Sequence, residues 1–156
     1  MTLYKKIMLV PYCIFHQQPI CSSASKGLAA FDQVIEWIST ENYYTFPTPC
    51  PKLTFKESGC TDLSLQESTS LAYRIHCRNI IKPLVEHLNT LDAIYGNSVG
   101  TIGLQGSSTC DTINGVLMNE IHKQLINNQI SIDIEWYIPN RISPSFNPLE
   151  NYILRN

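Results

Sequence analysis

The chain has 156 residues, of which 44% are hydrophobic and 15% are charged, values typical of one folded domain with a hydrophobic core of its own. Its formal net charge is −2 and its basic residues are scattered, so it lacks the basic surface that binds nucleic acid. No stretch approaches the roughly 20 apolar residues of a transmembrane helix, so we expect no membrane partner.

The first apolar segment follows two lysines and superficially resembles a signal peptide. Pro11 interrupts the segment, and "HQQP" ends it without a small-residue cleavage site. The continuous apolar run within Lys6 to Tyr12 is instead typical of a strand buried on both faces of a parallel sheet. We therefore expect a first strand here, in a cytoplasmic protein.

The segments that follow alternate between helical and extended patterns. Between residues 28 and 38 apolar side chains recur at the spacing of an amphipathic helix. Residues 43–47 ("YYTFP") predict a second short strand that ends at a proline. Residues 51–68 are polar and indicate a long loop, a feature that is usually functional or mobile in a compact domain.

The strongest predicted helix has one apolar stripe, made by Cys77, Ile80, Ile81, Leu84, Val85, Leu88 and Leu91. Thr69 or Ser70 is the expected N-cap. Pro83 lies inside the stripe and removes one backbone donor, so we expect a kink or a restart of the helix there.

The last third of the chain predicts a strand over 99–104, a helix over 116–126 and an edge strand in "ISIDIEWYI". The last segment alternates, which places Ile130, Ile132, Ile134, Trp136 and Ile138 on one face. We expect a single α/β domain over 1–140, with an open, mainly parallel four-stranded sheet, helices on both faces and a Rossmann-like arrangement. Residues 141–156 are expected to form a weakly packed tail.

Three of the six cysteines follow the three predicted parallel strands: Cys13, Cys50 and Cys110. Because parallel α/β sheets bind ligands at the carboxyl ends of their strands, we expect these thiols at one sheet edge. No CxxC pair exists, so any metal site must be assembled from distant segments. Three thiolates suit an iron–sulfur cluster with one open iron, or zinc with three protein ligands. The alternative is that each cysteine is a small buried hydrophobe.

The other thiols carry less information. Cys77 lies on the apolar helix stripe, where core packing is the better interpretation. Cys21 and Cys60 fall in predicted loops and receive no role.

The segment "LQGSSTCD" places a glycine and three hydroxyl residues before Cys110, at a strand-to-helix turn. Hydroxyls and backbone N–H groups at such a turn can bind an anion or a polar ligand. The alternative is an ordinary helix-capping turn. The segment lacks the Gly-x-Ser-x-Gly pattern of a hydrolase nucleophile elbow.

Four stretches, "IMLVPYCIFHQ", "PTPCPKLTF", "YRIHCR" and "IGLQGSSTCDTINGVL", resemble in order and spacing the thiouracil desulfidase-related proteins, over about residues 5–138. Members of that family have a cysteine after the first strand, a Cys-Pro-Glu motif and a Ser-Pro-Ser-Cys-Gly loop. The resemblance implies a 4Fe–4S cluster held by three cysteines, which match Cys13, Cys50 and Cys110. It also implies that the fourth iron, a soft Lewis acid, binds the sulfur of a thiolated substrate while water attacks the carbon.

The chain departs from the family pattern at three positions: Lys52 replaces the glutamate, Asp111 the final glycine and Ser108 the proline. Lysine cannot act as a carboxylate base unless its pKa falls far below about 10.4, but it can orient an anionic substrate or hydrosulfide. Asp111 is a candidate replacement for the carboxylate. Ser107 matches the first serine of the loop and is expected to contact substrate or water.

The leading hypothesis is therefore an iron–sulfur-dependent desulfidase that releases sulfide from a thiolated small molecule such as a thiolated nucleobase. The alternative is a catalytically impaired relative that binds sulfur or the cluster and responds to redox conditions. A third possibility is a structural relative without metal.

Overall fold

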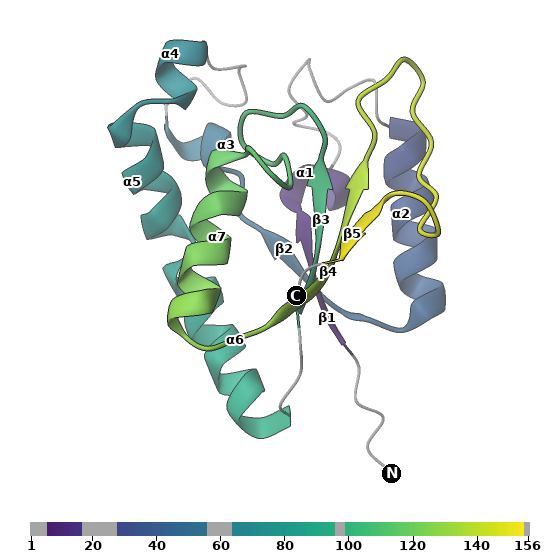
Figure 1. Ribbon diagram of the computed structural model, residues 1–156, viewed down its shortest axis with the longest axis horizontal. Helices are drawn as coiled ribbons and strands as arrows, with labels where there is room; N and C mark the ends of the chain where they lie inside the picture. The colour runs from purple at the N-terminus through teal and green to yellow at the C-terminus, as the bar shows by residue number, and fades with distance from the viewer. Residues whose placement is uncertain (1–5, 17–27, 56–63, 96–98, 155–156) are drawn as a thin grey trace.

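The computed structural model describes residues 6–16, 28–55, 64–95 and 99–154. One central sheet separates two helical layers (Figure 1). The strands are β1 (Ile7–Pro11), β2 (Tyr44–Thr48), β3 (Val99–Leu104), β4 (Ile132–Ile138) and β5 (Tyr152–Leu154). Their order across the sheet is β2-β1-β3-β4-β5, with the first four parallel and β5 antiparallel to β4. The predicted α/β fold with a mainly parallel open sheet is confirmed, and the sheet has a fifth strand that was not expected.

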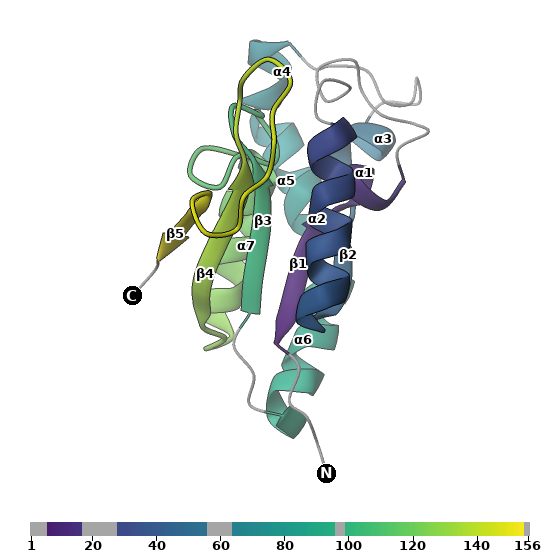
Figure 2. The same ribbon diagram turned by 90° about the vertical axis from the view of Figure 1, so that its right-hand side faces the viewer.

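The helices are α1 (Tyr12–Phe15), α2 (Leu28–Glu41), α3 (Pro51–Phe55), α4 (Leu65–Ser68), α5 (Leu71–Ile80), α6 (Lys82–Tyr95) and α7 (Val116–Asn127). Helix α2 covers one face of the sheet, and α5, α6 and α7 lie on the other side (Figures 1 and 2). No helix in the described ranges is long and apolar enough to cross a membrane.

The predicted long helix is divided as Pro83 suggested. Helix α5 ends at Ile80 and α6 begins at Lys82, so Pro83 lies in the first turn of α6, where its missing N–H group costs no intrahelical hydrogen bond. The Ser70 side chain caps α5 by accepting a hydrogen bond from the Tyr73 backbone N–H at 3.1 Å.

A bulge in β4 divides the apolar residues that the sequence had placed on one face. Val99 pairs with Ile132 whereas Thr101 pairs with Glu135, so β4 contributes one residue more than β3 over this interval. Ile132 therefore packs with the α5–α7 layer, whereas Trp136 lies in the core beneath α2. The expected single face is wrong because the extra residue reverses the alternation.

Residues 141–154 pack more closely than the sequence suggested. Pro144 and Phe146 are buried, and Phe146 belongs to the core beneath α2. Its backbone N–H donates to the Gln33 side chain at 2.7 Å. Strand β5 then pairs with β4, so β4 is not the edge strand of the sheet.

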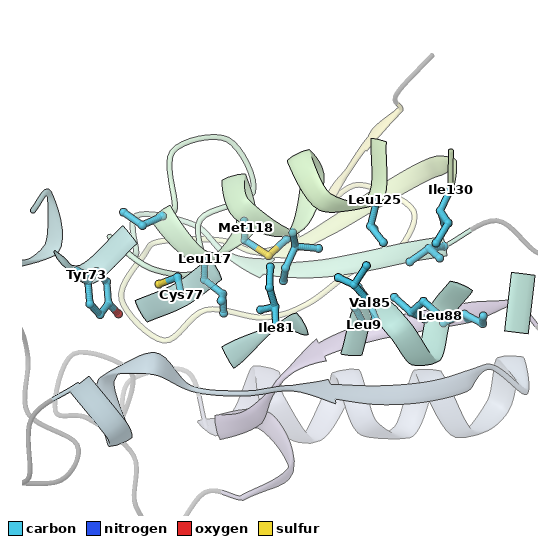
Figure 3. Close-up of a cluster of buried hydrophobic side chains, with 14 residues drawn as sticks. Leu9, Tyr73, Cys77, Ile81, Val85, Leu88, Leu117, Met118, Leu125 and Ile130 are labelled. Atoms are coloured by element: carbon cyan, nitrogen blue, oxygen red, sulfur yellow. The ribbon is translucent and has the colours of Figure 1, made fainter. Parts of the chain in front are cut away.

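The α5–α7 core, shown in Figure 3, fills the space between these helices and the sheet. Its fully buried members include Tyr73 and Cys77 from α5, Leu117 and Ile121 from α7, and Leu9 from β1. Burial of each large aliphatic side chain contributes about 1.5–3 kcal/mol. This core fixes α5 and α7 against the sheet and so fixes the loops at its carboxyl edge.

Candidate metal centre

The three cysteines singled out by sequence lie just beyond the carboxyl ends of three neighbouring strands. Cys13 lies in α1, two residues after β1, and Cys50 lies between β2 and α3. Cys110 lies in the loop that joins β3 to α7. Figure 1 shows α1, α3 and this loop together at the same end of the sheet. The topology thus places segments far apart in sequence at one edge.

The thiols influence one another's pKa values. Burial raises the pKa of Cys13 to about 11, and the nearby Cys50 thiolate adds to this rise. Burial also raises the pKa of Cys110 well above its ordinary value, with Cys13 and then Cys50 contributing in the same direction. Because water and salt screen charges over longer distances, such coupling indicates that these side chains are close together.

Lys52 brings a positive charge to the same place. It lies in the first turn of α3, two residues after Cys50, and is partly buried. Its ammonium group opposes the effect of burial, so the pKa values of Cys13 and Cys110 rise less than they would without it. Lys52 therefore places a cation near the thiols.

Within the described ranges, no group of three or more His, Cys, Asp or Glu side chains is arranged to hold a single metal ion. Sulfur ligands lie about 2.3 Å from one ion and so within about 4 Å of one another. Ligands of a cubane cluster bind different irons, so their sulfur atoms stand about 6–7 Å apart. The described residues thus contain no preformed site for a metal ion.

Ser107 organises the backbone around Cys110. Its Oγ accepts hydrogen bonds from the backbone N–H groups of Thr109 at 3.2 Å and Cys110 at 3.0 Å. The Cys110 carbonyl in turn accepts a hydrogen bond from the Leu104 N–H at 2.9 Å, which joins the loop to the end of β3. The hydrogen bonds from Thr109 and Cys110 use lone pairs of the Ser107 oxygen, so the hydroxyl hydrogen of Ser107 is not needed to hold the loop.

Asp111 closes the same loop through both carboxylate oxygens. Oδ2 accepts from the Gly106 N–H at 2.6 Å, and Oδ1 accepts from the N–H groups of Ile113 at 2.8 Å and Asn114 at 3.0 Å. Partial burial acts to raise the pKa of this carboxyl, but the three hydrogen bonds outweigh it and lower the pKa. This engagement favours a loop-stabilising role for Asp111 over the role of general base that the sequence suggested.

Gly103 in β3 allows the loop to fold back over the strand. A Cβ atom at this position would lie 2.8 Å from the Cys110 carbonyl oxygen and would collide with the Thr112 side chain. A glycine inside a strand is typical of such a close approach by another backbone segment. Cys110 is therefore held by backbone packing as well as by hydrogen bonds.

Sequence reasoning missed the part of α5 that faces this edge. The hydroxyl of the buried Tyr73 lies 2.8 Å from Thr109 Oγ1. Burial raises the pKa of Tyr73, the Thr109 hydrogen bond opposes this, and the thiolates of Cys77, Cys110 and Cys50 raise it further. The stretch "YRIHCR" contains both Tyr73 and Cys77 at helical spacing, but its apolar stripe also suits an ordinary core. Cys21 and Cys60 lie outside the described residues.

No family model matches the chain, and no solved structure matches it. The chain is 26% identical over 123 residues to an uncharacterized protein of Methanocaldococcus jannaschii, and the alignment covers 78% of each chain. The similarity extends over most of the domain but brings no information on activity.

Proposed function

We propose that the chain holds a 4Fe–4S cluster through Cys13, Cys50 and Cys110 and hydrolyses a carbon–sulfur bond of a thiolated small molecule, such as a thiolated nucleobase. The observation that supports this proposal is the convergence of three thiols and the Lys52 ammonium at the carboxyl edge of the sheet. The family resemblance of the same segments is consistent with it.

The donor set suits an iron–sulfur centre. Three thiolates are soft ligands of the kind that hold such clusters. In the metal-free chain the raised pKa of Cys13, about 11, and that of Cys110 keep both thiols protonated at neutral pH. Thiols lose their protons when they bind a cationic metal, so loading should release protons. When bound, the cluster would supply an open iron as a soft Lewis acid for a substrate sulfur atom.

The surrounding side chains have separate parts in this proposal. The Lys52 charge stabilises an anionic sulfur species beside the thiols, as its effect on Cys13 and Cys110 illustrates. The Ser107 hydroxyl can donate its hydrogen to substrate or water while its oxygen keeps the two backbone contacts. In the overall reaction water replaces sulfur on carbon, sulfur leaves with the electrons of the carbon–sulfur bond, and no oxidant is needed.

One observation favours a second candidate, a cluster-binding or sulfur-binding protein that responds to redox conditions without turnover. The family glutamate is Lys52, and the Asp111 carboxylate is occupied by three backbone N–H groups. Neither residue is an evident base for the attacking water. The two candidates share the ligands and differ only in catalysis.

The test is anaerobic reconstitution with iron and sulfide, removal of unbound sulfide, and incubation with a thiolated pyrimidine. We expect bound iron and acid-labile sulfide, and free sulfide that appears as the thione absorbance falls. Cys13→Ser, Cys50→Ser and Cys110→Ser should each lower bound iron, whereas Cys21→Ser serves as the matched control. An intact cluster without sulfide release would leave the second candidate. Absence of bound iron, or unchanged iron in all three variants, would overturn both.

A further inference from the structure

We propose that the chain forms a twofold dimer in which the outer edge of β5 pairs antiparallel with β5 of a second copy. Strand β5 ends the strand order of the sheet, and Figure 2 shows it at the margin of the molecule. Within the described ranges no strand pairs with its outer side. An open strand edge pairs readily with another extended segment, and the structure of β5 favours a second copy of the same strand.

The backbone of β5 presents two residues to the open side. In the β4–β5 ladder the Tyr137 N–H donates to the Asn151 carbonyl at 3.0 Å, so Asn151 turns its carbonyl toward β4. Backbone directions alternate along an antiparallel strand, so Ile153 also faces β4. Tyr152 and Leu154 therefore turn their N–H and C=O groups outward.

These outward groups are complementary to a copy of themselves. With Ile153 on the twofold axis, Tyr152 lies opposite Leu154 of the second copy, and Leu154 lies opposite Tyr152 of the second copy. Both are hydrogen-bonded pairs, and each exchanges two N–H···O=C bonds. The pairing is isologous, because the same residues serve both copies.

The side chains of the same two residues are apolar and exposed. Directly opposed residues share a face of an antiparallel pair, so Tyr152 lies on the face of Trp136, and Leu154 on that of Ile134. Both β4 residues pack with the core beneath α2, whereas Tyr152 and Leu154 remain 42% and 65% exposed. In the dimer these two side chains cover one another across the axis as aromatic–aliphatic pairs.

Further apolar side chains border β5. Ile153 lies opposite Glu135, which contacts His122 of α7, so α7 borders β5 on this face. Ile126 follows His122 by about one helical turn and is 69% exposed. Leu149, shortly before β5, is 83% exposed. A stable dimer buries about 1,200–2,000 Å² in total, more than two short strands provide, and these side chains extend the contact.

The two edges of the sheet differ in how they resist pairing. Strand β2 contains Pro47, which lacks an N–H group and is a residue that native sheets use to block edges. Strand β5 contains neither a proline nor a charged residue. The nearby Glu150 carboxylates lie at opposite ends of the antiparallel pair, so like charges do not meet. Pairing through the twofold axis uses both open edges, so assembly stops at the dimer.

The test measures the mass of the whole chain by analytical ultracentrifugation over a concentration series, and we expect a monomer–dimer equilibrium. Leu154→Lys places a charge in the contact, and Tyr152→Pro removes an outward N–H group but leaves the Ile153 bonds to β4. Each variant should raise the dimer dissociation constant at least about 10-fold. Leu71→Lys alters a similarly exposed leucine on α5 and should dimerise as the wild type does.

Ile153→Cys tests the register directly. Opposed residues of a non-hydrogen-bonded pair have Cα atoms about 4.5 Å apart, within the reach of a disulfide. On oxidation we expect more covalent dimer than in the wild type or in Leu71→Cys.

A wild type that stays monomeric at every concentration would overturn the inference, as would assemblies larger than a dimer. A dimer that Leu154→Lys and Tyr152→Pro leave unchanged, or that Leu71→Lys weakens equally, would exclude the β5 edge as the contact. If the β5 variants fold poorly, a covalent yield from Ile153→Cys no higher than that from Leu71→Cys excludes it.

Discussion

The Tyr73 hydroxyl lies 2.8 Å from Thr109 Oγ1, and both residues are buried. This contact joins α5 to the loop that carries Cys110. Tyr73→Phe keeps the ring that packs against Phe55 but removes the partner of a buried hydroxyl. We expect the free energy of unfolding in urea to fall by about 1–3 kcal/mol, the usual penalty of an unsatisfied buried group.

Thr109→Val provides the other half of this test. Removal of both hydroxyls leaves neither group unsatisfied, so the double variant should lose less stability than the sum of the two single variants. Additive losses would show that the two hydroxyls do not interact.

Two glycines of β3 make a matched pair for the packing beneath Cys110. Gly103→Ala would place a Cβ atom 2.8 Å from the Cys110 carbonyl oxygen, a backbone atom that cannot move without the loop. Gly100→Ala would meet Met8 Cε and Trp136 Cζ3 at 3.1 Å, and the methionine end is flexible. We expect Gly103→Ala to destabilise the fold by at least about 1–3 kcal/mol, the usual penalty of overpacking, and to impair iron loading. Gly100→Ala should have the smaller effect on both measurements, and the reverse order would contradict this account of the loop.

The Asp111 carboxylate should make loop stability depend on pH. Its pKa is lowered from the ordinary 3.8, so its contribution is present above that value and is lost as pH falls through the lowered folded-state pKa. Asp111→Asn places an amide NH₂ opposite backbone N–H donors, and we expect a loss of about 1–2 kcal/mol near pH 7. Urea denaturation from pH 7 down to about pH 2 should show the two proteins converging only below about pH 4. A constant difference across this range would exclude the carboxylate as its source.

Much of the fold was predictable because local pattern and tertiary packing agree. The apolar run before Cys13 is a strand buried on both faces, and the strand over 99–104 was found at its expected bounds. Pro83 marked the division between α5 and α6 for a simple covalent reason, its missing donor. The β4 bulge was not predictable, because the alternation of "ISIDIEWYI" continues through it without a break. Strand β5 pairs through backbone groups, which leave little pattern in three residues.

The candidate site was likewise predictable only in part. The positions of Cys13, Cys50 and Cys110 after successive strands follow from topology alone. The engagement of Asp111 with three N–H groups depends on the loop conformation, which its sequence does not reveal. Cys77 lies on an apolar stripe, which indicated core packing, and it is fully buried in the α5–α7 core.

The Lys52 charge should be measurable in the metal-free chain through the reactivity of Cys13. Burial and the Cys50 thiolate raise the pKa of Cys13 to about 11, and Lys52 acts in the opposite direction. Lys52→Gln should therefore raise the pKa further, lower the thiolate fraction and slow alkylation by iodoacetamide at pH 8–9. Lys52→Arg keeps the charge and is the control. Mass spectrometry of the Cys13 peptide gives the rate, and faster alkylation in Lys52→Gln would contradict the placement of the charge.

Lys52→Glu tests whether the missing carboxylate limits catalysis. It introduces, two residues after Cys50, the glutamate of the Cys-Pro-Glu motif that the sequence resembles, and a general base can contribute about 10²–10⁴-fold in rate. We expect sulfide release per bound cluster to rise at least about 10-fold over the wild type. The same charge reversal should hinder cluster binding. A carboxylate near Cys13 and Cys110 raises the pKa values of these thiols, whereas Lys52 acts to lower them. The rate of sulfide release must therefore be expressed per bound iron. Lys52→Gln is the control, because it removes the positive charge without adding a carboxylate. If Lys52→Glu and Lys52→Gln show equal release per cluster, the carboxylate is not what the chain lacks, and the cluster-binding candidate without turnover becomes the better description.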